Sequence, residues 1–267
     1  MSHRGDAIER RAKFIEVLER KKIEACFFLA TTFRSGSTSL GRLLFDQTRL
    51  AFHLEQFNIV PTWFKLTDAS LGHAISQSLS PVVKGHYASK LMWPHRNNVA
   101  TFLGIDRAHS SEFLTVFPSV KFVHLVRQDK VAQAVSYYIA RKTDNWGGAD
   151  ERGALNGDVA YSFHAILEYY KSLSYHDSLW DDFFRTIDVE VKKVFFEDAI
   201  ADPERATSSV LKALALPPVG PGRFRAAAAP RKQAALNEEF SKRFLDDLYT
   251  LSPLELLPGR LIGPFTP

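Results

Sequence analysis

A buried strand, a glycine-containing turn and a helix follow one another early in the chain, and this order restricts the fold more than any other feature. Residues 25–30 (ACFFLA) form an unbroken apolar run of strand length, which is typical of a strand buried on both faces. Residues 31–38 are mostly small and polar, and Leu40, Leu43 and Leu44 then recur at helical spacing. A strand, a tight turn and a helix in this order begin an α/β unit.

The alternation of strands and helices continues along the chain. The patterns predict strands at 86–93, 120–126 and 189–196. They predict helices at 6–22, 98–116, 130–141, 161–184 and 233–248, and a helix at 199–216 that is interrupted near Pro203. Asp129 is placed to cap the helix at 130–141. Strands that alternate with helices predict an α/β fold with a parallel sheet and helices on both of its faces. We expect a helical extension over residues 1–24 and a single domain over 25–267.

Composition excludes several classes of protein. Of the 267 residues, 45% are hydrophobic and 24% charged, the balance of a soluble globular protein. No apolar run approaches the ~18 residues of a membrane span, and the N-terminal stretch lacks the apolar core of a secretory signal. The single cysteine, Cys26, excludes an intrachain disulfide and a cysteine-based metal site, so we expect a reducing compartment, the cytoplasm. No histidine pair has metal-ligand spacing, so no metal is expected.

The charge balance also points to a class of ligand. The chain has 34 Lys and Arg residues against 30 Asp and Glu residues, a net charge of +4. Because the basic residues are interspersed with acidic ones, this charge does not indicate nucleic acid. It is compatible with a small anionic ligand.

The turn after the first strand has the composition of an anion site. Backbone N–H groups converge where a turn of small residues meets the start of a helix, and the helix dipole favours negative charge there. Gly36 permits close backbone approach, and Arg34 adds a fixed charge with forked donors. The hydroxyl donors are Ser35, Ser37, Thr38 and Ser39. The turn therefore predicts a site for a phosphate or sulfate ester, and the alternative is an ordinary serine-rich helix cap.

This turn differs from the phosphate loop of nucleoside triphosphatases. That loop requires a Gly-Lys pair, whose lysine contacts the β- and γ-phosphates. Gly-Lys occurs nowhere in the chain, and Arg34 stands before the glycine instead. A nucleoside triphosphate with Mg²⁺ is therefore disfavoured, and a kinase-like phosphotransferase stays as an alternative.

A second group of candidate residues follows the strand at 120–126. Arg127 ends that strand, and Ser136 lies nine residues later within the next helix. In a parallel sheet this strand end opens at the same edge as the Arg34 turn, where such folds bind ligands. Arg127 and Ser136 could clamp a second phosphate. The alternatives are a surface ion pair of Arg127 with Asp129 and a plain helix-surface serine.

Two motifs in these segments resemble those of a known family. The motif T-x-R-S-G-S-T at 32–38 and the run HLVRQDKVAQAVSYY at 124–138 resemble the two cofactor loops of sulfotransferases that use 3′-phosphoadenosine-5′-phosphosulfate. The resemblance is closest to the bacterial trehalose 2-sulfotransferase-type family, whose Lys-Leu-Met-Trp is present at 90–93. It covers roughly residues 25–248.

The resemblance implies a fold, a cofactor and roles for particular residues. The fold would be a P-loop-like three-layer α/β fold, and relatives suggest a homodimer. The cofactor would be 3′-phosphoadenosine-5′-phosphosulfate, without a metal. Thr32 and the loop 34–39 would hold the 5′-phosphosulfate, while Arg127, Ser136 and Arg231 would hold the 3′-phosphate. Trp146 would contact the adenine or the acceptor.

The resemblance also implies a general base. In the trehalose-type family a glutamate some twenty residues after the loop arginine has this role, and that position is Glu55 here. Many cytosolic sulfotransferases use a histidine two residues after a strand-end lysine, but that position holds Met92, which cannot accept a proton. His53 is the alternative base, and an exposed loop acid is the plain interpretation of Glu55. Lys90 would steady the sulfuryl or bridging oxygens.

These features predict an enzyme that transfers a sulfuryl group to a hydroxyl of a carbohydrate or other small polar metabolite. Trp93 could form a platform for a sugar ring, and a plain core role is at least equally compatible with its position. A non-catalytic nucleotide-binding protein of the same fold is the further alternative. The N-terminal helix could be a dimer element, a lid over the acceptor or neither.

Overall fold

The computed structural model describes residues 3–106, 110–146, 159–217 and 231–250. The chain divides into two compact units. The first comprises residues 1–128 and 176–226, and the second comprises residues 129–175 and 227–267. The expectation of a single domain after residue 24 stays a prediction.

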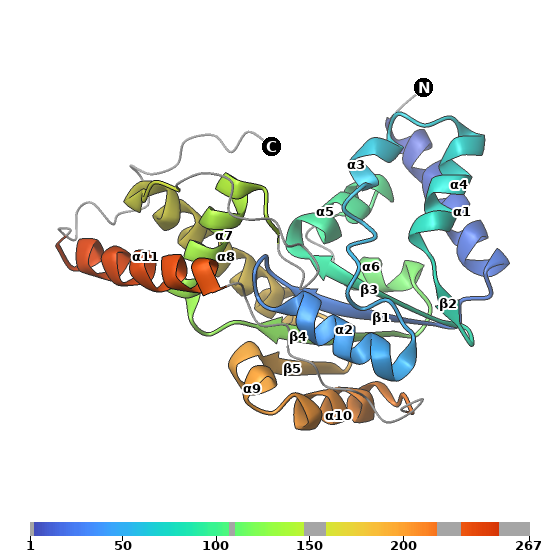
Figure 1. Ribbon diagram of the computed structural model, residues 1–267. Helices are drawn as coiled ribbons and strands as arrows, with labels where there is room; N and C mark the ends of the chain where they lie inside the picture. The colour runs from blue at the N-terminus through green and yellow to red at the C-terminus, as the bar shows by residue number, and fades with distance from the viewer. Residues whose placement is uncertain (1–2, 107–109, 147–158, 218–230, 251–267) are drawn as a thin grey trace. The chain divides into compact units, whose positions relative to one another are not determined.

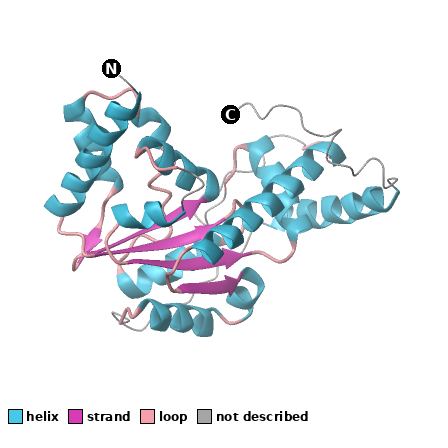
Figure 2. Ribbon diagram, turned by 180° about the vertical axis from the view of Figure 1, so that it is seen from behind, coloured by secondary structure: helices cyan, strands magenta, loops and turns pink. Residues whose placement is uncertain are grey.

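A five-stranded sheet lies at the centre of the first unit (Figures 1 and 2). Its strands are β1 (Ala25–Thr31), β2 (Val82–Val83), β3 (His86–Met92), β4 (Val120–Val126) and β5 (Val191–Phe195). The spatial order is β2-β3-β1-β4-β5, and every pairing is parallel except that of β2 with β3. The predicted strands are confirmed, and the two-residue β2 is too short to leave a periodic pattern in the sequence.

Alternate residues of β1 face two different hydrophobic clusters, because successive side chains of a strand point to opposite faces. Phe28 and Ala30 belong to the larger cluster, and Phe27 and Leu29 to the smaller one. All four are nearly or fully buried. The continuous apolar run therefore reflects a central strand covered on both sides, as the sequence predicts.

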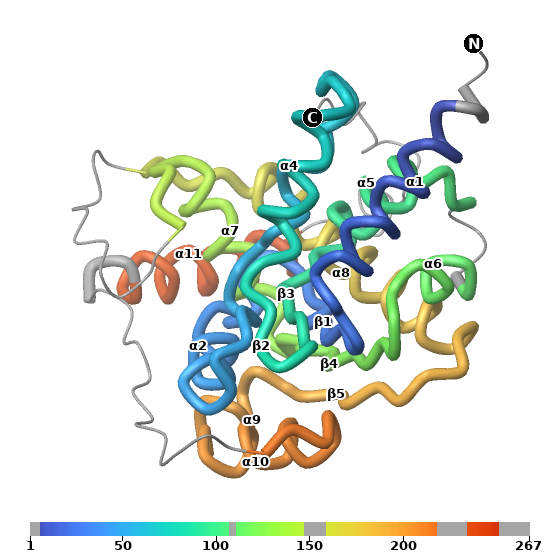
Figure 3. The backbone as a smooth tube through the Cα atoms, turned by 90° about the vertical axis from the view of Figure 1, so that its right-hand side faces the viewer, coloured from blue at the N-terminus to red at the C-terminus, as the bar shows by residue number. Residues whose placement is uncertain are grey.

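Helices cover both faces of this sheet, so the predicted α/β fold with helices flanking a central sheet is confirmed (Figure 3). The larger cluster is covered by α1 (His3–Arg20), α3 (Val60–Trp63), α4 (Asp68–Ser78), α5 (Trp93–Phe102), α6 (Ser110–Val116) and the end of α8 (Phe163–Thr186). The smaller cluster is covered by α2 (Ser37–Thr48), α9 (Phe196–Ala201) and α10 (Pro203–Leu214).

One sequence expectation for the first unit needs correction. The single helix predicted over 98–116 is two helices, α5 and α6, and Gly104 between them has a left-handed φ of +66°. Pro94 lies in the first turn of α5, where a missing N–H costs nothing.

The N-terminal helix α1 is an integral part of the first unit. Phe14, Val17 and Leu18 are buried in the larger cluster, and the Phe14 ring meets the Phe117 ring edge-on at 5.4 Å between centroids. The segment predicted as an extension therefore contributes to the core.

The second unit contains α7 (Lys130–Thr143), the first part of α8, and α11 (Arg231–Thr250). Aromatic side chains join these helices: the Phe240 ring lies 6.4 Å from the Tyr138 ring, and Phe244 stacks on Phe163 at 5.1 Å. As predicted, Asp129 caps α7, since its side chain accepts a hydrogen bond from the Ala132 amide at 2.8 Å. No helix in the described ranges is long and apolar enough to cross a membrane.

Candidate active site

The parallel pairing of β1 with β4 brings two predicted segments together at the carboxyl edge of the sheet. Ala30 pairs with His124 in register, so the chain leaves both strands at the same edge. There the Arg127 guanidinium donates a hydrogen bond to the Arg34 carbonyl oxygen at 3.3 Å. The predicted meeting of the Arg34 turn with Arg127 is therefore confirmed.

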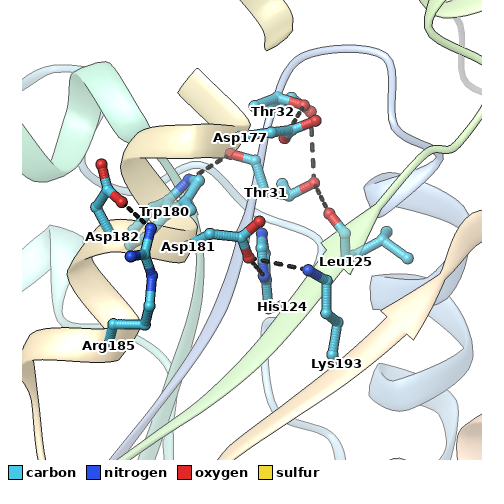
Figure 4. A network of polar contacts seen from close by, with 10 residues as sticks. All are labelled: Thr31, Thr32, His124, Leu125, Asp177, Trp180, Asp181, Asp182, Arg185 and Lys193. Carbon is cyan, nitrogen blue, oxygen red and sulfur yellow. Dashed lines mark hydrogen bonds and ion pairs between the residues drawn. The ribbon is translucent and has the colours of Figure 1, made fainter. Parts of the chain in front are cut away.

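The turn after β1 is held by hydrogen bonds to two neighbouring elements (Figure 4). The Thr31 hydroxyl lies 2.6 Å from the Ser35 hydroxyl and donates to the Leu125 carbonyl of β4 at 2.8 Å. The Thr32 hydroxyl donates to the buried Asp177 carboxylate of α8 at 3.1 Å. Asp177 was not among the predicted site residues, because an acid inside a long helical pattern carries no local signal of a contact 145 residues away.

The start of α2 is open to an anion. Gly36 is the N-cap residue and has no side chain to bond the first amides of the helix. The Ser39 and Leu40 amides bond the Gly36 carbonyl oxygen, so the earlier amides of the first turn and the positive end of the helix dipole are the groups left for an anion. Arg34 and Gly36 have left-handed φ angles of 60° and 82°, whereas Ser35 between them does not. A backbone that alternates between left- and right-handed conformations gathers its N–H groups into a concavity.

Two guanidinium groups lie close together beside this helix start. Burial lowers the pKa of Arg34, and the positive charge of Arg127 lowers it further. The Arg127 guanidinium also lies 5.0 Å above the centre of the Phe196 ring, the first residue of α9. Two like charges repel each other, so an anion between them would stabilise both. The electrostatics of the turn thus match its predicted ligand class.

Lys90 connects the turn at 31–38, which we call the anion turn, to Glu55. Lys90 lies opposite Leu29 in the pairing of β3 with β1, and it is only 4% exposed. Its Nζ donates to the Thr38 Oγ1 at 3.0 Å and lies 2.8 Å from the Glu55 Oε1. One ammonium group therefore spans the start of α2 and the carboxylate predicted as the base.

The segment that carries Glu55 is held between β3 on one side and α2 on the other. The Leu54 carbonyl accepts hydrogen bonds from the Lys90 amide at 2.9 Å and from the Ser89 hydroxyl at 3.2 Å. On the other side α2 packs so closely that a Cβ on Gly41 would lie 2.7 Å from the His53 Cα. Glu55 is thus held at the carboxyl edge of the sheet although its segment has no regular secondary structure.

The structure adds His95 to this group. His95 lies in the first turn of α5, and its Nε2 is 4.0 Å from the Glu55 Oε2. Burial lowers the pKa of His95, Lys90 lowers it further, and Glu55 raises it. No pattern in the sequence predicts a role for this histidine, and the only local signal is its position five residues after Lys90 and directly after Pro94.

The alternative base, His53, is half-buried and lies two residues before Glu55 in the sequence. Its ring meets the Phe45 ring at 4.9 Å between centroids. Burial lowers the pKa of His53, and the charges of Arg42 and Lys90 lower it further. No contact of His53 with Glu55 is among those of the described residues.

Four other predicted residues have no printed contact with this group or have side chains outside the described part. Trp93 is in the core, edge-on to the Trp180 ring at 4.9 Å, which is the environment of the core residue named as the alternative. Ser136 is buried on α7, and Trp146 is 39% exposed with its indole N–H donating to Asp144. Both belong to the second unit. Arg231 begins α11, and its side chain lies outside the described part.

A comparison with known protein families shows to which family the chain belongs. The model of the Stf0 sulphotransferase family matches residues 85–247, more than half of the chain. The chain belongs to the Stf0 sulphotransferase family. The protein is therefore a sulfotransferase, an enzyme that transfers a sulfuryl group. The matched region includes Lys90, His95 and Arg127, and it begins after the Arg34 turn and Glu55.

Solved structures similar to this sulfotransferase are also sulfotransferases. A sulfotransferase from Alicyclobacillus acidocaldarius is 14% identical, with 85% of this chain and 94% of that chain covered and a TM-score of 0.46. The sulfotransferase domain from the curacin biosynthetic pathway is 11% identical, with 85% and 98% covered and a TM-score of 0.42. The sulfotransferase domain of the Synechococcus PCC 7002 olefin synthase is 14% identical, with 86% and 96% covered and a TM-score of 0.38. A search of curated proteins finds no significant match.

Proposed function

We propose that this sulfotransferase moves the sulfuryl group of 3′-phosphoadenosine-5′-phosphosulfate to a hydroxyl of a carbohydrate or other small polar metabolite, with Glu55 as the general base. The observation that carries the proposal is the position of Lys90. Its Nζ contacts both the Thr38 hydroxyl at the anion turn and the Glu55 carboxylate, at 3.0 and 2.8 Å. A group bound at the turn and a hydroxyl bound at Glu55 would therefore be neighbours.

The donor fits the residues of the turn. A phosphosulfate is a compact dianion, and the open amides of α2 together with Arg34 and Arg127 supply N–H donors and positive charge. The turn lacks the lysine that a triphosphate requires, which favours a phosphosulfate over ATP. We assign the 5′-phosphosulfate to Thr32 and the loop 34–39.

The remaining donor contacts follow from the family resemblance. We assign the 3′-phosphate to Arg127 and Ser136, with Arg231 closing on it, and Trp146 to the adenine or the acceptor. The proposal requires no metal, because a sulfuryl group carries less charge than a phosphoryl group. We also propose that the enzyme is cytoplasmic, as the single cysteine suggests, and a homodimer, as the resemblance to the trehalose-type family implies.

Sulfuryl transfer resembles phosphoryl transfer, so positioning and electrostatic stabilisation supply most of the catalysis. Glu55 accepts the proton of the acceptor hydroxyl as the new O–S bond forms. The bond between sulfur and the bridging oxygen breaks, and its electron pair stays on the departing phosphate. Lys90, Arg34 and the amides of α2 stabilise the charge that this phosphate gains.

A thermal-shift titration tests the donor. The ligand is 3′-phosphoadenosine-5′-phosphate without metal, compared with ATP and Mg²⁺. At a hundred times its dissociation constant a ligand stabilises by about 2.7 kcal/mol, which raises the Tm by roughly 5–10 °C for a chain of this size. We expect this shift with the bisphosphate. A shift with ATP and Mg²⁺ alone would exclude the proposed donor.

Replacing Glu55 by Gln tests the base. We expect Glu55→Gln to lower kcat by about 10²–10⁴-fold, the usual contribution of a general base, while the bisphosphate shift is kept. The matched control is Glu9→Gln, an exposed glutamate of α1, which should leave kcat unchanged. If His53→Gln shows the large loss and Glu55→Gln does not, the base is His53.

A further inference from the structure

His95 is a buried imidazole beside the Phe33 ring and Glu55. Its residue is 8% exposed, and its Nδ1 has no hydrogen-bond partner among the described residues. The ring meets Phe33 of the anion turn edge-on, at 6.1 Å between centroids. A buried polar side chain is normally hydrogen-bonded, so one that is not calls for a functional explanation.

The distance from His95 to Glu55 indicates what could satisfy it. The 4.0 Å between Nε2 and Oε2 is too long for a direct hydrogen bond. It is the separation expected of two atoms that each bond one shared oxygen at about 2.8 Å with an angle of about 90° between the bonds. The two side chains thus leave room for a single hydroxyl oxygen.

Lys90 gives the two oxygens of Glu55 different surroundings. The ammonium lies 2.8 Å from Oε1, whereas Oε2 is the oxygen on the side of His95. Lys90 therefore fixes the carboxylate through one oxygen and leaves the other to receive a proton. This division places the reactive oxygen of Glu55 opposite the imidazole.

We propose that Glu55 Oε2 and His95 Nε2 together form the subsite for the acceptor hydroxyl, and that His95 is a second catalytic residue. This proposal rests on the proposed function of Glu55. The imidazole N–H donates a hydrogen bond to the hydroxyl oxygen, and the hydroxyl donates its own to Oε2. As the O–S bond forms, the hydroxyl proton passes to Glu55, and the electron pair of the broken S–O bond leaves with the phosphate of the donor.

The protonation state of His95 agrees with this role. Burial lowers its pKa, and of the charged groups that face it Lys90 lowers the pKa and Glu55 raises it, so the imidazole is neutral near pH 7. The proton then belongs on Nε2, because a buried N–H without a partner at Nδ1 is less tolerable than a buried acceptor. A neutral donor holds the hydroxyl without competing with Lys90 for the carboxylate.

Two substitutions separate hydrogen bonding from packing. His95→Gln keeps an amide N–H near the position of Nε2, and His95→Phe keeps a ring without a donor. The control is His73→Phe, an exposed histidine of α4. The assay measures transfer from ³⁵S-labelled 3′-phosphoadenosine-5′-phosphosulfate to glycerol, a probe that requires nothing of the site beyond a hydroxyl subsite. Each variant is also titrated with the bisphosphate.

We expect His95→Phe to lower kcat/KM for glycerol at least tenfold, the factor typical of one lost hydrogen bond, and His95→Gln to stay within about threefold of the wild type. Bisphosphate binding should be unchanged in both. In the wild type the rate should fall as the pH drops through the lowered pKa of His95, and in His95→Gln this limb should disappear or move to lower pH.

Other results would overturn the proposal. Wild-type transfer by His95→Phe with intact bisphosphate binding would show that the imidazole does not hold the hydroxyl. Equal losses in the Gln and Phe variants would assign His95 to packing. If the wild type binds the bisphosphate but transfers nothing to glycerol, the subsite does not accept a bare hydroxyl as stated. If the wild type does not bind the bisphosphate, the proposed function fails instead.

Discussion

Gly36 combines two restrictions that exclude a side chain. Its φ of +82° lies in the left-handed region, and a Cβ would come within 2.1 Å of the Phe196 ring. The same ring supports the Arg127 guanidinium from 5.0 Å. A single glycine therefore permits both the shape of the anion turn and the position of one of its two cations.

We expect Gly36→Ala to lower the free energy of unfolding by about 1–3 kcal/mol, because left-handed backbone costs an L-residue roughly 1–2 kcal/mol and the Phe196 ring must also move. Bisphosphate affinity should fall with it. Urea denaturation and the thermal-shift titration measure the two effects. The matched control is Gly72→Ala in α4, where the Cβ would meet only the flexible end of Lys13, at 3.1 Å. Equal effects at both positions would contradict this explanation.

At the scale of elements, the sequence of α10 determines where this helix begins and which of its sides packs in the smaller hydrophobic cluster. Asp202 precedes Pro203, and its carboxylate accepts the Arg205 amide at 2.9 Å. Val210, Leu211 and Leu214 bury one stripe of this helix in the smaller hydrophobic cluster. The cap and the proline fix where the helix begins, and the apolar stripe fixes which side meets the sheet.

Removing this cap should affect stability alone. We expect Asp202→Ala to lower the free energy of unfolding by about 1 kcal/mol and the Tm by roughly 2–4 °C, since one amide of the first turn loses its acceptor. Bisphosphate binding should not change, because α10 contributes no residue to the candidate site. The comparison is Glu204→Ala, an exposed neighbour in the same turn whose loss should matter less. A change in bisphosphate affinity without a change in Tm would refute this separation of roles.

At the scale of the whole molecule, burial on folding lowers the pKa of several histidines. Burial is the main cause that lowers the pKa of His53, His95 and His176 below its ordinary value near 6.5. In the unfolded chain each of these histidines binds a proton as the pH falls through about 6.5, whereas in the folded protein it binds a proton only at lower pH. The unfolded state therefore gains protons first.

The sign of this linkage predicts that the free energy of unfolding decreases as the pH falls from 7.5 towards 5.5. Urea denaturation at a series of pH values measures the slope. His176→Gln removes one contributor outside the candidate site and should flatten the slope. A stability that stays constant or rises over this interval would contradict the prediction, as would an unchanged slope in the His176 variant.

The sequence alone was sufficient for the local parts of the site. The strand, turn and helix around Gly36, the cap at Asp129 and the meeting of Arg34 with Arg127 at one sheet edge followed from period, capping chemistry and parallel topology. The helix predicted over 98–116 was wrong because its apolar residues run on through Gly104, where the backbone adopts a left-handed conformation.

Tertiary structure decided the contacts of Glu55 with Lys90 and His95, on which the proposals rest. Residues 49–59 have no periodic pattern, so nothing local shows that Leu54 bonds to β3 or that Glu55 meets Lys90. The environment of His95 likewise depends on Glu55, forty positions earlier, and on burial by neighbouring helices. Sequence determines which backbone a segment prefers because that preference depends on neighbours in the chain. A distance of 2.8 or 4.0 Å between side chains depends on strand register and packing, which exist only once the whole unit has folded.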